Sequence, residues 1–335
     1  MKSRFFILFG LLIISSASSF GQLTPISNNV FPIGDNHSIS WKSSMVKSES
    51  IIFEANPVIT YSIFNNIYKK LKSDRDTAIA IYFLYRPQLR MYTDRSLPVK
   101  MPSYKILTGF QCVLRDRIFN EDNLFAIAIE SGHYSNGQGG CAFSTLYRDG
   151  TRESDSVIAA ITPKTNLSAI LNRVDGEFST NLTEFVVNYR FNSDFRYNIA
   201  NQTISIKYGL TYYHKFMLGF IPMGGYANNL IGIYGHRRHK FGIEYIKVRG
   251  NNKISIAENL EYIRGAHPFV NPIRIETIFS YFFHGEAGVF ISYVYGHDNY
   301  NSRFVDSGHQ VSIGFTWSIF PPFETKSMKD KEYLN

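Results

Sequence analysis

The sequence has no long hydrophobic run beyond its N-terminal end, and it contains little cysteine and tryptophan. No stretch after residue 21 approaches the ~20 uninterrupted apolar residues that a membrane-spanning helix requires. No transmembrane helix is therefore predicted. Tyrosine, phenylalanine and glycine are instead abundant, with 22, 28 and 24 residues.

The N-terminal end has the pattern of a secretory signal peptide. Lys2 and Arg4 precede an apolar run over residues 5–14, and small residues follow as far as a predicted cleavage site near Gly21. The apolar run is too short to span a bilayer. The exported chain would meet an oxidising compartment, where a disulfide has to be considered. Cys112 is expected well down a strand and Cys141 in an outer loop, too far apart to bond.

Alternating segments separated by turn signals predict an all-β fold, a 12-stranded antiparallel transmembrane β-barrel over residues 36–320. An even strand number is usual for bacterial single-chain barrels. A short segment, 22–35, precedes the barrel, and a polar tail, 321–335, follows it. The expected strands are 36–44, 51–65, 77–92, 103–114, 122–136, 178–192, 202–215, 237–248, 253–264, 272–283, 286–298 and 307–320.

Parity along the strands predicts the orientation of the side chains and of the loops. In a membrane barrel the bulky apolar side chains face lipid, and the small and polar ones face the lumen. Periplasmic turns are short and extracellular loops are longer, so the long segment 137–177 is placed outside and the N-terminus inside. The predicted location is the bacterial outer membrane. The net charge of +8 is compatible with an anionic lipid surface.

Two segments rich in charge or glycine are given no catalytic role. The segment 236–240, His-Arg-Arg-His-Lys, is interpreted as a strand start at the lipid headgroups, where cations meet phosphates, and not as a metal or nucleic-acid motif. No nucleic-acid partner is therefore expected. The segment 223–225, Met-Gly-Gly, is interpreted as a flexible loop.

The candidate site lies at the end of the fifth predicted strand. Side chains at i and i+2 share one face of a strand, so His133 and Ser135 point the same way, on the bulky face that also carries Ile127 and Ile129. Nine steps of about 3.3 Å at a tilt near 45° raise His133 roughly 20 Å above the strand start, at ester depth in the outer leaflet. A hydrolytic pair on the lipid side suggests a lipid substrate.

A third group is needed because serine is a poor nucleophile unless a base takes its proton, and the base works best when its tautomer is fixed. On the neighbouring strand 178–192, Asn181 has outward parity and is expected opposite His133. Glu184 is chemically a better partner, but its parity sends it to the lumen. Glu177 has the right parity but sits at the loop end. Asn181 is therefore the predicted third member.

The segment from His133 to Gly137, His-x-Ser-Asn-Gly, resembles the active-site motif of the outer-membrane phospholipase A family. The segments 179–182, 29–36 and 295–301 also resemble that family. The resemblance implies a twelve-stranded barrel that hydrolyses the acyl esters of glycerophospholipids. It implies Ser135 as nucleophile, His133 as base, Asn181 as orienting residue and the Gly137 N–H as oxyanion donor.

The resemblance also implies partners: a phospholipid substrate, outer-membrane lipids, a homodimer, and Ca²⁺ bound at the dimer interface by outer-loop oxygens. The matching calcium ligands are Ser96 and Gln138, where the family usually has arginine and where a main-chain carbonyl can still serve. The loop 137–177 is much longer than the family's.

Two other functions remain open from the sequence. An outer-membrane lipid A deacylase carries a similar His-x-Ser-Asn motif on a smaller barrel, normally with an acidic third residue. A non-catalytic barrel that serves as a channel or scaffold would need neither Ser135 nor His133.

Overall fold

The computed structural model describes residues 22–24, 37–47, 49–67, 70, 77–94, 98–118, 121–191, 202–225, 230–249, 252–283, 287–317 and 324–326. The predicted signal peptide 1–21, most of the segment 22–35 and most of the polar tail 321–335 lie outside these residues. Two short strands at the ends of the chain, β1 (Gln22–Thr24) and β15 (Glu324–Lys326), pair with each other.

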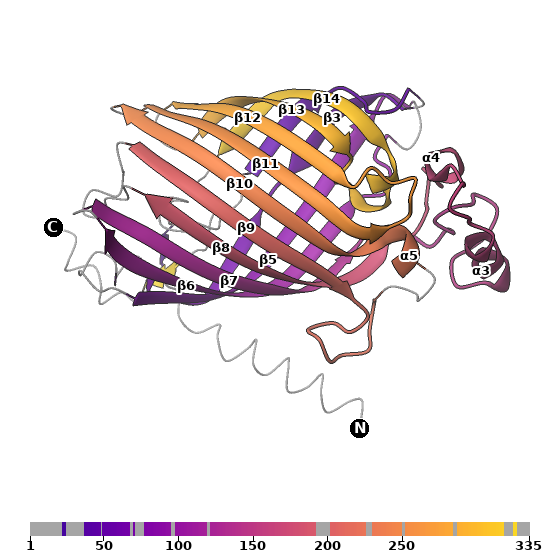
Figure 1. The fold of residues 1–335 in the computed structure, drawn as a ribbon, viewed down its shortest axis with the longest axis horizontal. Coiled ribbons are helices and arrows are strands. Elements are labelled where there is room, and N and C mark those ends of the chain that lie inside the picture. Colours follow the sequence, from indigo (N-terminus) through magenta and orange to yellow (C-terminus); the bar gives the residue numbers. More distant parts are fainter. Residues whose placement is uncertain are drawn as a thin grey trace.

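The remaining strands form a closed antiparallel barrel (Figure 1). Consecutive strands pair with each other, except that β3 and β4 both pair with β5, and β14 pairs with β2, which closes the sheet. The strands are β2 (His37–Lys42), β3 (Ile51–Asn56), β4 (Ile59–Asn65), β5 (Thr77–Tyr92), β6 (Ser103–Ile118), β7 (Glu121–Ser135), β8 (Ser179–Phe191), β9 (Gln202–His214), β10 (Gly235–Arg249), β11 (Asn252–Ala266), β12 (Ile273–Phe283), β13 (Ala287–His297) and β14 (Ser307–Trp317).

The predicted strand 51–65 is interrupted at Pro57, and its two halves β3 and β4 both pair with β5. Together they therefore occupy the position of one strand in the barrel wall, and the predicted count of twelve strands is confirmed. Proline has no N–H to donate to a strand ladder. The next N–H, that of Val58, donates to His37 Nδ1 at 3.0 Å, and the His37 ring stacks on Trp317.

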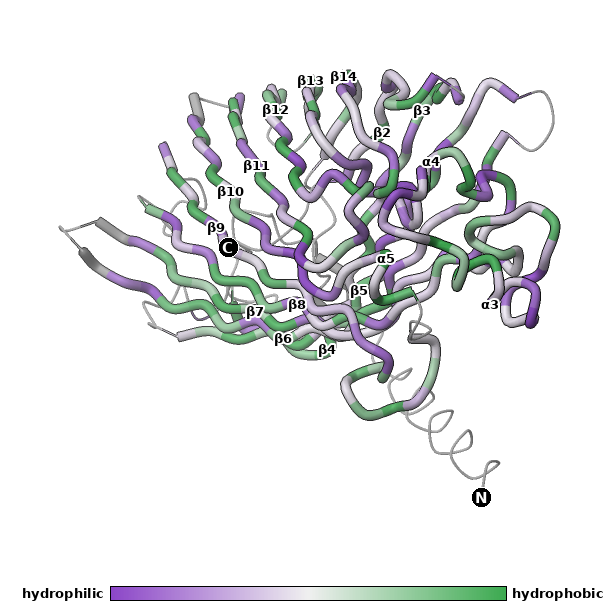
Figure 2. The backbone as a smooth tube through the Cα atoms, turned by 45° about the vertical axis from the view of Figure 1, so that its right-hand side comes forward, coloured by the Kyte–Doolittle hydropathy of each residue, from purple (hydrophilic) through white to green (hydrophobic). Residues whose placement is uncertain are grey.

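The two faces of the wall alternate as the parity argument predicts. On β14, Val311, Ile313 and Phe315 are exposed on the outside, whereas Ser312 and Thr316 are buried on the inside. Figure 2 shows this alternation of apolar and polar residues along the strands. Cys112 and Cys141 are both free thiols, as expected from their separation. No helix in the described part of the chain is long and apolar enough to span a membrane.

Arg238 and Lys240 differ from the interpretation of segment 236–240 as a contact with headgroups, whereas Arg237 is exposed opposite the outward-facing Tyr212. Arg238 is buried and pairs with Glu261, and Lys240 Nζ lies 2.8 Å from Glu184 Oε1. Both cations belong to the inward face of β10, so they neutralise lumenal carboxylates and do not meet lipid phosphates. The lumenal position predicted for Glu184 is correct.

Long connections gather at one end of the barrel, and this outer end carries the helices α3 (Arg152–Ala159), α4 (Leu167–Ile170) and α5 (Ile231–Tyr234) (Figure 1). Thr151 caps α3 by accepting from the Ser154 N–H, and Asn166 caps α4 in the same way. A short 3-10 helix, η1 (Asn301–Val305), lies between β13 and β14.

The outer mouth of the barrel is filled by side chains. Phe178 lies 4.8 Å from Tyr134 and 5.3 Å from Tyr234 between ring centroids, and Tyr234 lies 5.1 Å from Phe304. All four rings are buried, and they come from β7, the loop before β8, α5 and η1. This aromatic column ties the outer loops together above the lumen.

Ion pairs hold the long loop 136–178 against the other outer loops that close the mouth of the barrel. The Arg173 guanidinium binds both carboxylate oxygens of Asp306 at 2.7 and 2.8 Å, and it also reaches Glu49 at 3.1 Å. Ser168, in α4, donates to Asp306 as well. Asp306 follows η1, so the loop is fixed to two other outer connections.

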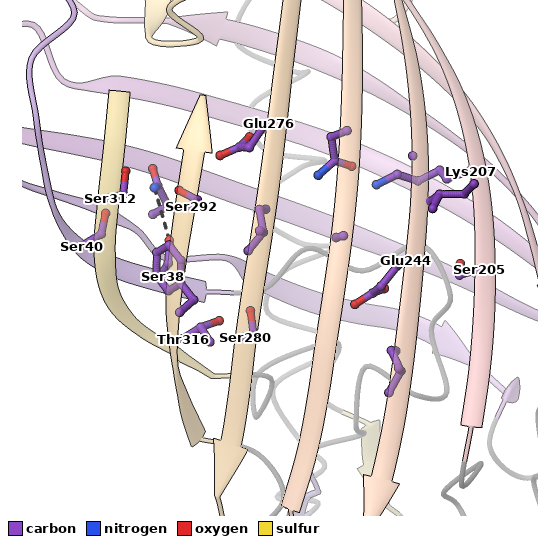
Figure 3. A pocket seen from close by; sticks show the side chains of 18 of the residues that line it. Ser38, Ser40, Ser205, Lys207, Glu244, Glu276, Ser280, Ser292, Ser312 and Thr316 are labelled. Carbon is purple, nitrogen blue, oxygen red and sulfur yellow. Dashed lines mark hydrogen bonds between the residues drawn. The ribbon is translucent and has the colours of Figure 1, made fainter. Parts of the chain in front are cut away.

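The lumen keeps a polar cavity of about 400 Å³, shown in Figure 3. Its lining comes from small hydroxyl side chains and from charged residues such as Lys207, Glu244 and Glu276. These residues belong to the inward face of the wall, away from the outward face that carries His133 and Ser135.

Candidate active site on the outer wall

His133 and Asn181 lie opposite each other on β7 and β8, in the register that parity predicts. His133 Nδ1 and Asn181 Oδ1 are 3.1 Å apart. The same register places Ser135 opposite Ser179 and Ser131 opposite Thr183. The expected outward polar cluster above an apolar band is therefore present.

The carboxamide of Asn181 is fully buried and has only one possible orientation. Its Nδ2 donates to the main-chain oxygens of Lys215 at 2.9 Å and of Met223 at 2.6 Å. Carbonyl oxygens accept only, so the amide nitrogen must face them and Oδ1 must face His133. Oδ1 can only accept, which places the imidazole proton on Nδ1. The Nε2 of a neutral His133 is left as the acceptor, the state that a general base requires.

Ser135 is half-buried at the end of β7, two residues beyond His133 on the same face. Within the described residues no hydrogen bond joins Ser135 Oγ to the imidazole. Catalytic hydrogen bonds are often long in free enzymes and tighten when substrate binds. The structure therefore places Ser135 beside an oriented histidine without a formed Ser–His bond.

The turn after Ser135 is built by Asn136, which is fully buried. Its Nδ2 donates to Gly176 O at 2.7 Å, and its Oδ1 accepts from the N–H groups of Phe178 and Gln138 at 3.0 and 3.2 Å. Asparagine in this motif thus fixes the strand end to the start of β8.

Gly137 follows with φ +64 and is exposed, and a Cβ built on it would meet no atom within 4 Å. This backbone conformation favours glycine. No acceptor in the described part of the chain takes the Gly137 N–H. An exposed N–H two residues after the serine is suited to bind an oxyanion.

The segment 215–225 contributes to the site, although the sequence suggested only a flexible loop at residues 223–225. A Cβ built on Gly224 would lie 2.6 Å from His133 Cε1, so the backbone of Gly224 sits directly on the imidazole. Ser179 Oγ donates to Gly224 O at 2.9 Å. Two successive glycines after Pro222 permit such a close approach, and that pair was the available signal.

A second polar row lies one pair below His133 on the same wall. Thr183 Oγ1 is 2.8 Å from Ser131 Oγ and 2.9 Å from His214 Nε2. His214, on β9, is directly opposite Asn181 in the register. Sequence analysis did not include His214 because a lone histidine at a strand end carries no recognisable pattern.

Of the two calcium ligands suggested by the sequence, only Gln138 belongs to the described residues. No group of three His, Cys, Asp or Glu side chains suitable for a metal occurs among them. Gln138 is half-buried, and its side-chain amide donates back to Asn136 O at 3.4 Å. Ser96, the other ligand suggested by the sequence, lies outside the described residues.

Two carboxyl groups interact in the long loop above the site. Burial, followed by a hydrogen bond that protonated Glu177 donates to Asp149 and by repulsion between the two carboxylates, raises the pKa of Glu177 to about 8. The Glu177 N–H donates to Gly140 O, and the Asp149 N–H donates to Gly139 O. A protonated Glu177 can donate to the Asp149 carboxylate and so help to hold the loop segment that follows Gly137.

Comparison with solved structures supports the fold. Outer membrane phospholipase A from Escherichia coli aligns with a TM-score of 0.50 at 9% identity, over 91% of this chain and 95% of that chain. The Salmonella typhi outer membrane phospholipase dimer with bound calcium aligns with 0.47 at 10% identity over 91% and 95%. LpxR from Salmonella typhimurium aligns with 0.36 at 6% identity over 84% and 99%.

No protein-family profile and no curated protein matches the sequence. At these identities the structural likeness concerns the fold alone. The twelve-stranded closure, the apolar outer surface and the first of these alignments agree with one another. The chain is a bacterial outer-membrane β-barrel with the fold of outer membrane phospholipase A.

Proposed function

We propose that this protein hydrolyses acyl ester bonds of glycerophospholipids at the outer wall of the barrel. The observation that carries the proposal is the His133–Asn181 pair, which has a fixed tautomer and lies on the face that contacts lipid. Ser135 is the nucleophile, His133 the base and Asn181 the orienting residue. A triad inside the lumen would have no access to bilayer lipids, whereas this one does.

In the first step His133 Nε2 takes the proton of Ser135 while Oγ attacks the ester carbonyl carbon. The tetrahedral oxyanion accepts a hydrogen bond from the Gly137 N–H. The carbon–oxygen bond to the glycerol then breaks, and His133 returns its proton to that oxygen. The products are a lysophospholipid and an acylated Ser135.

In the second step water attacks the acyl-serine and gives its proton to His133. The second oxyanion uses the same Gly137 N–H, and the fatty acid leaves as Ser135 recovers its proton from His133. Asn181 supplies no charge to the imidazolium because its side chain is neutral. It stabilises the correct ring orientation in both steps.

Calcium and a second copy of the chain belong to the same proposal through the sequence resemblance. Ser96 and the main-chain carbonyl of Gln138 would hold the ion. A bound calcium supplies positive charge next to a developing oxyanion. Two barrels would pair through their exposed apolar walls, with phospholipid bound between them.

The filled outer mouth argues against a channel. Besides the aromatic column, Arg90 on β5 is buried and binds Asp298, which follows β13, at 2.6 Å, and its cross-strand neighbour Glu54 on β3 at 2.8 Å. A conducting pore keeps a continuous water-filled route, which these side chains interrupt. A lipid A deacylase would use the same wall, and its substrate becomes an outcome of the test below.

The test is fatty-acid release from phosphatidylethanolamine in mixed micelles by refolded wild type and Ser135→Ala, each with calcium and with chelator. We expect release by wild type alone, lost on chelation. Fatty-acid release that survives chelation would support the Ser–His–Asn triad and rule out a requirement for calcium. No release from a folded barrel would contradict the phospholipase proposal, and lipid A would be assayed next.

A further inference from the structure

The loop between β9 and α5 exposes an unusual amount of apolar side chain. Residues 215–225 fold as a tight hairpin in which Met217 and Ile221 exchange backbone hydrogen bonds at 2.8 and 2.9 Å. At its tip Phe220 is 73% exposed, and Met223 is 57% exposed. Phe216 and Leu218 are also exposed. Soluble surfaces rarely gather so many large apolar side chains in one patch.

This hairpin lies against the outside of the wall and not above the lumen. Its main-chain oxygens at Lys215 and Met223 bind Asn181, and Gly224 covers the ring of His133, both of which face outward. In Figure 1 the loop projects from the wall beside the outer end of β9, and Figure 2 shows its apolar residues in green.

The exposed tip continues the lipid-facing band of β9. Tyr212, Ile206 and Ile204 are exposed on the outward face of that strand below the hairpin. An exposed cation, Lys215, stands at the base of the loop. Exposed apolar side chains next to a cation at the wall are the arrangement of an interfacial membrane anchor, in which the cation stays with the headgroups.

We propose that the hairpin 215–225 inserts its apolar tip into the acyl layer of the membrane and forms one wall of the path along which a lipid acyl chain reaches Ser135. The acyl-chain path to Ser135 rests on the proposed function, whereas insertion of the hairpin into the membrane does not. The apolar surface of the hairpin would be covered by long acyl chains of the bilayer. Substrates with long chains in an aggregated phase would therefore be preferred over soluble short-chain esters.

Insertion is tested first by a measurement that needs no activity. Phe220→Trp is made in a background carrying Trp41→Phe and Trp317→Phe, and the protein is refolded into vesicles of phosphatidylcholine with brominated acyl chains. The matched control is Leu146→Trp, because Leu146 is 80% exposed on the long loop 136–178. We expect at least a threefold greater loss of fluorescence for Trp at 220. Equal quenching at the two positions would overturn insertion.

The acyl path is tested by the double variant Phe216→Ser/Phe220→Ser, with Leu146→Ser/Tyr147→Ser as control. We expect at least a tenfold loss of hydrolysis on long-chain phospholipid vesicles and a change within twofold on a soluble short-chain ester. The control should change neither rate. Equal effects on both substrates would overturn the path. If wild type hydrolyses neither substrate, the proposed function fails while the quenching result on insertion still stands.

Discussion

The contact between Gly224 and His133 gives a sharp prediction about the geometry of the site. The Cβ of a Gly224→Ala variant would lie 2.6 Å from His133 Cε1, whereas ordinary contacts begin at 3.4 Å. The imidazole or the loop must therefore retreat by about 0.8 Å. A misplacement on the order of 1 Å in a catalytic group costs ~100-fold in rate. We expect Gly224→Ala to lower kcat by roughly 10- to 100-fold.

The matched control is Gly219→Ala in the same hairpin. Gly219 also has a positive φ, +82 against +66 for Gly224, but its Cβ would meet no atom within 4 Å. Both variants carry the backbone strain of alanine at positive φ, on the order of 1 kcal/mol. Only Gly224→Ala adds the clash with His133. We expect Gly219→Ala to stay within threefold of wild type.

The assay is kcat for fatty-acid release from phosphatidylethanolamine mixed micelles, with the barrel fold checked by heat-dependent gel mobility. If both variants lose activity equally, strain in the loop explains the effect and the contact with His133 is irrelevant. If both keep wild-type activity, His133 has room to move, and the proposal that the hairpin positions it is refuted.

Asn181→Ala removes one hydrogen-bond acceptor of His133, worth about 1–3 kcal/mol. It should slow hydrolysis by roughly 5- to 150-fold. A loss of activity as large as that of Ser135→Ala would contradict a purely orienting role for Asn181. Asn136→Ala leaves buried main-chain groups unpaired at about 1–3 kcal/mol each, so the loop 136–178 should be cleaved faster in limited proteolysis, and unchanged cleavage would show that Asn136 does not hold the turn. The pKa of Glu177 is raised to about 8 beside Asp149, so the stabilisation that its proton gives is complete below the ordinary carboxyl pKa of 4.5 and is lost as pH rises through 8. Proteolysis of the loop should therefore accelerate between pH 5 and 8 in wild type but not in Glu177→Gln, and equal pH profiles would remove Glu177 as the cause.

The strands and their register were predictable because one physical constraint determines them all. Lipid on one side of the wall and a polar lumen on the other force apolar and polar side chains to alternate along every strand. The parity that placed Asn181 opposite His133 is confirmed in the register. The interruption at Pro57 was missed because apolar and polar side chains keep alternating along the chain both before and after the proline. Arg238 and Lys240 were assigned to headgroups because their segment was interpreted by charge without a count of its parity.

The contribution of residues 215–225 was not predictable in the same way. Its contacts with Asn181 and His133 are made by main-chain atoms, at Lys215 O, Met223 O and the backbone of Gly224. Main-chain contacts leave almost no trace in side-chain pattern, and only the paired glycines hinted at a close approach. The packing of α5 and η1 into the outer mouth likewise depends on contacts between distant loops.

The aromatic column in the outer mouth has a consequence for the cell that makes this protein. The rings of Tyr134, Phe178, Tyr234 and Phe304 narrow the outer end of the lumen. A barrel closed in this way would become more abundant without weakening the permeability barrier of the outer membrane. Under the proposed function, harm from unregulated copies would come from the outside of the wall, as lysophospholipid and fatty acid released into the bilayer. Control over such an enzyme would act on access of lipid to Ser135, and not on opening of the lumen.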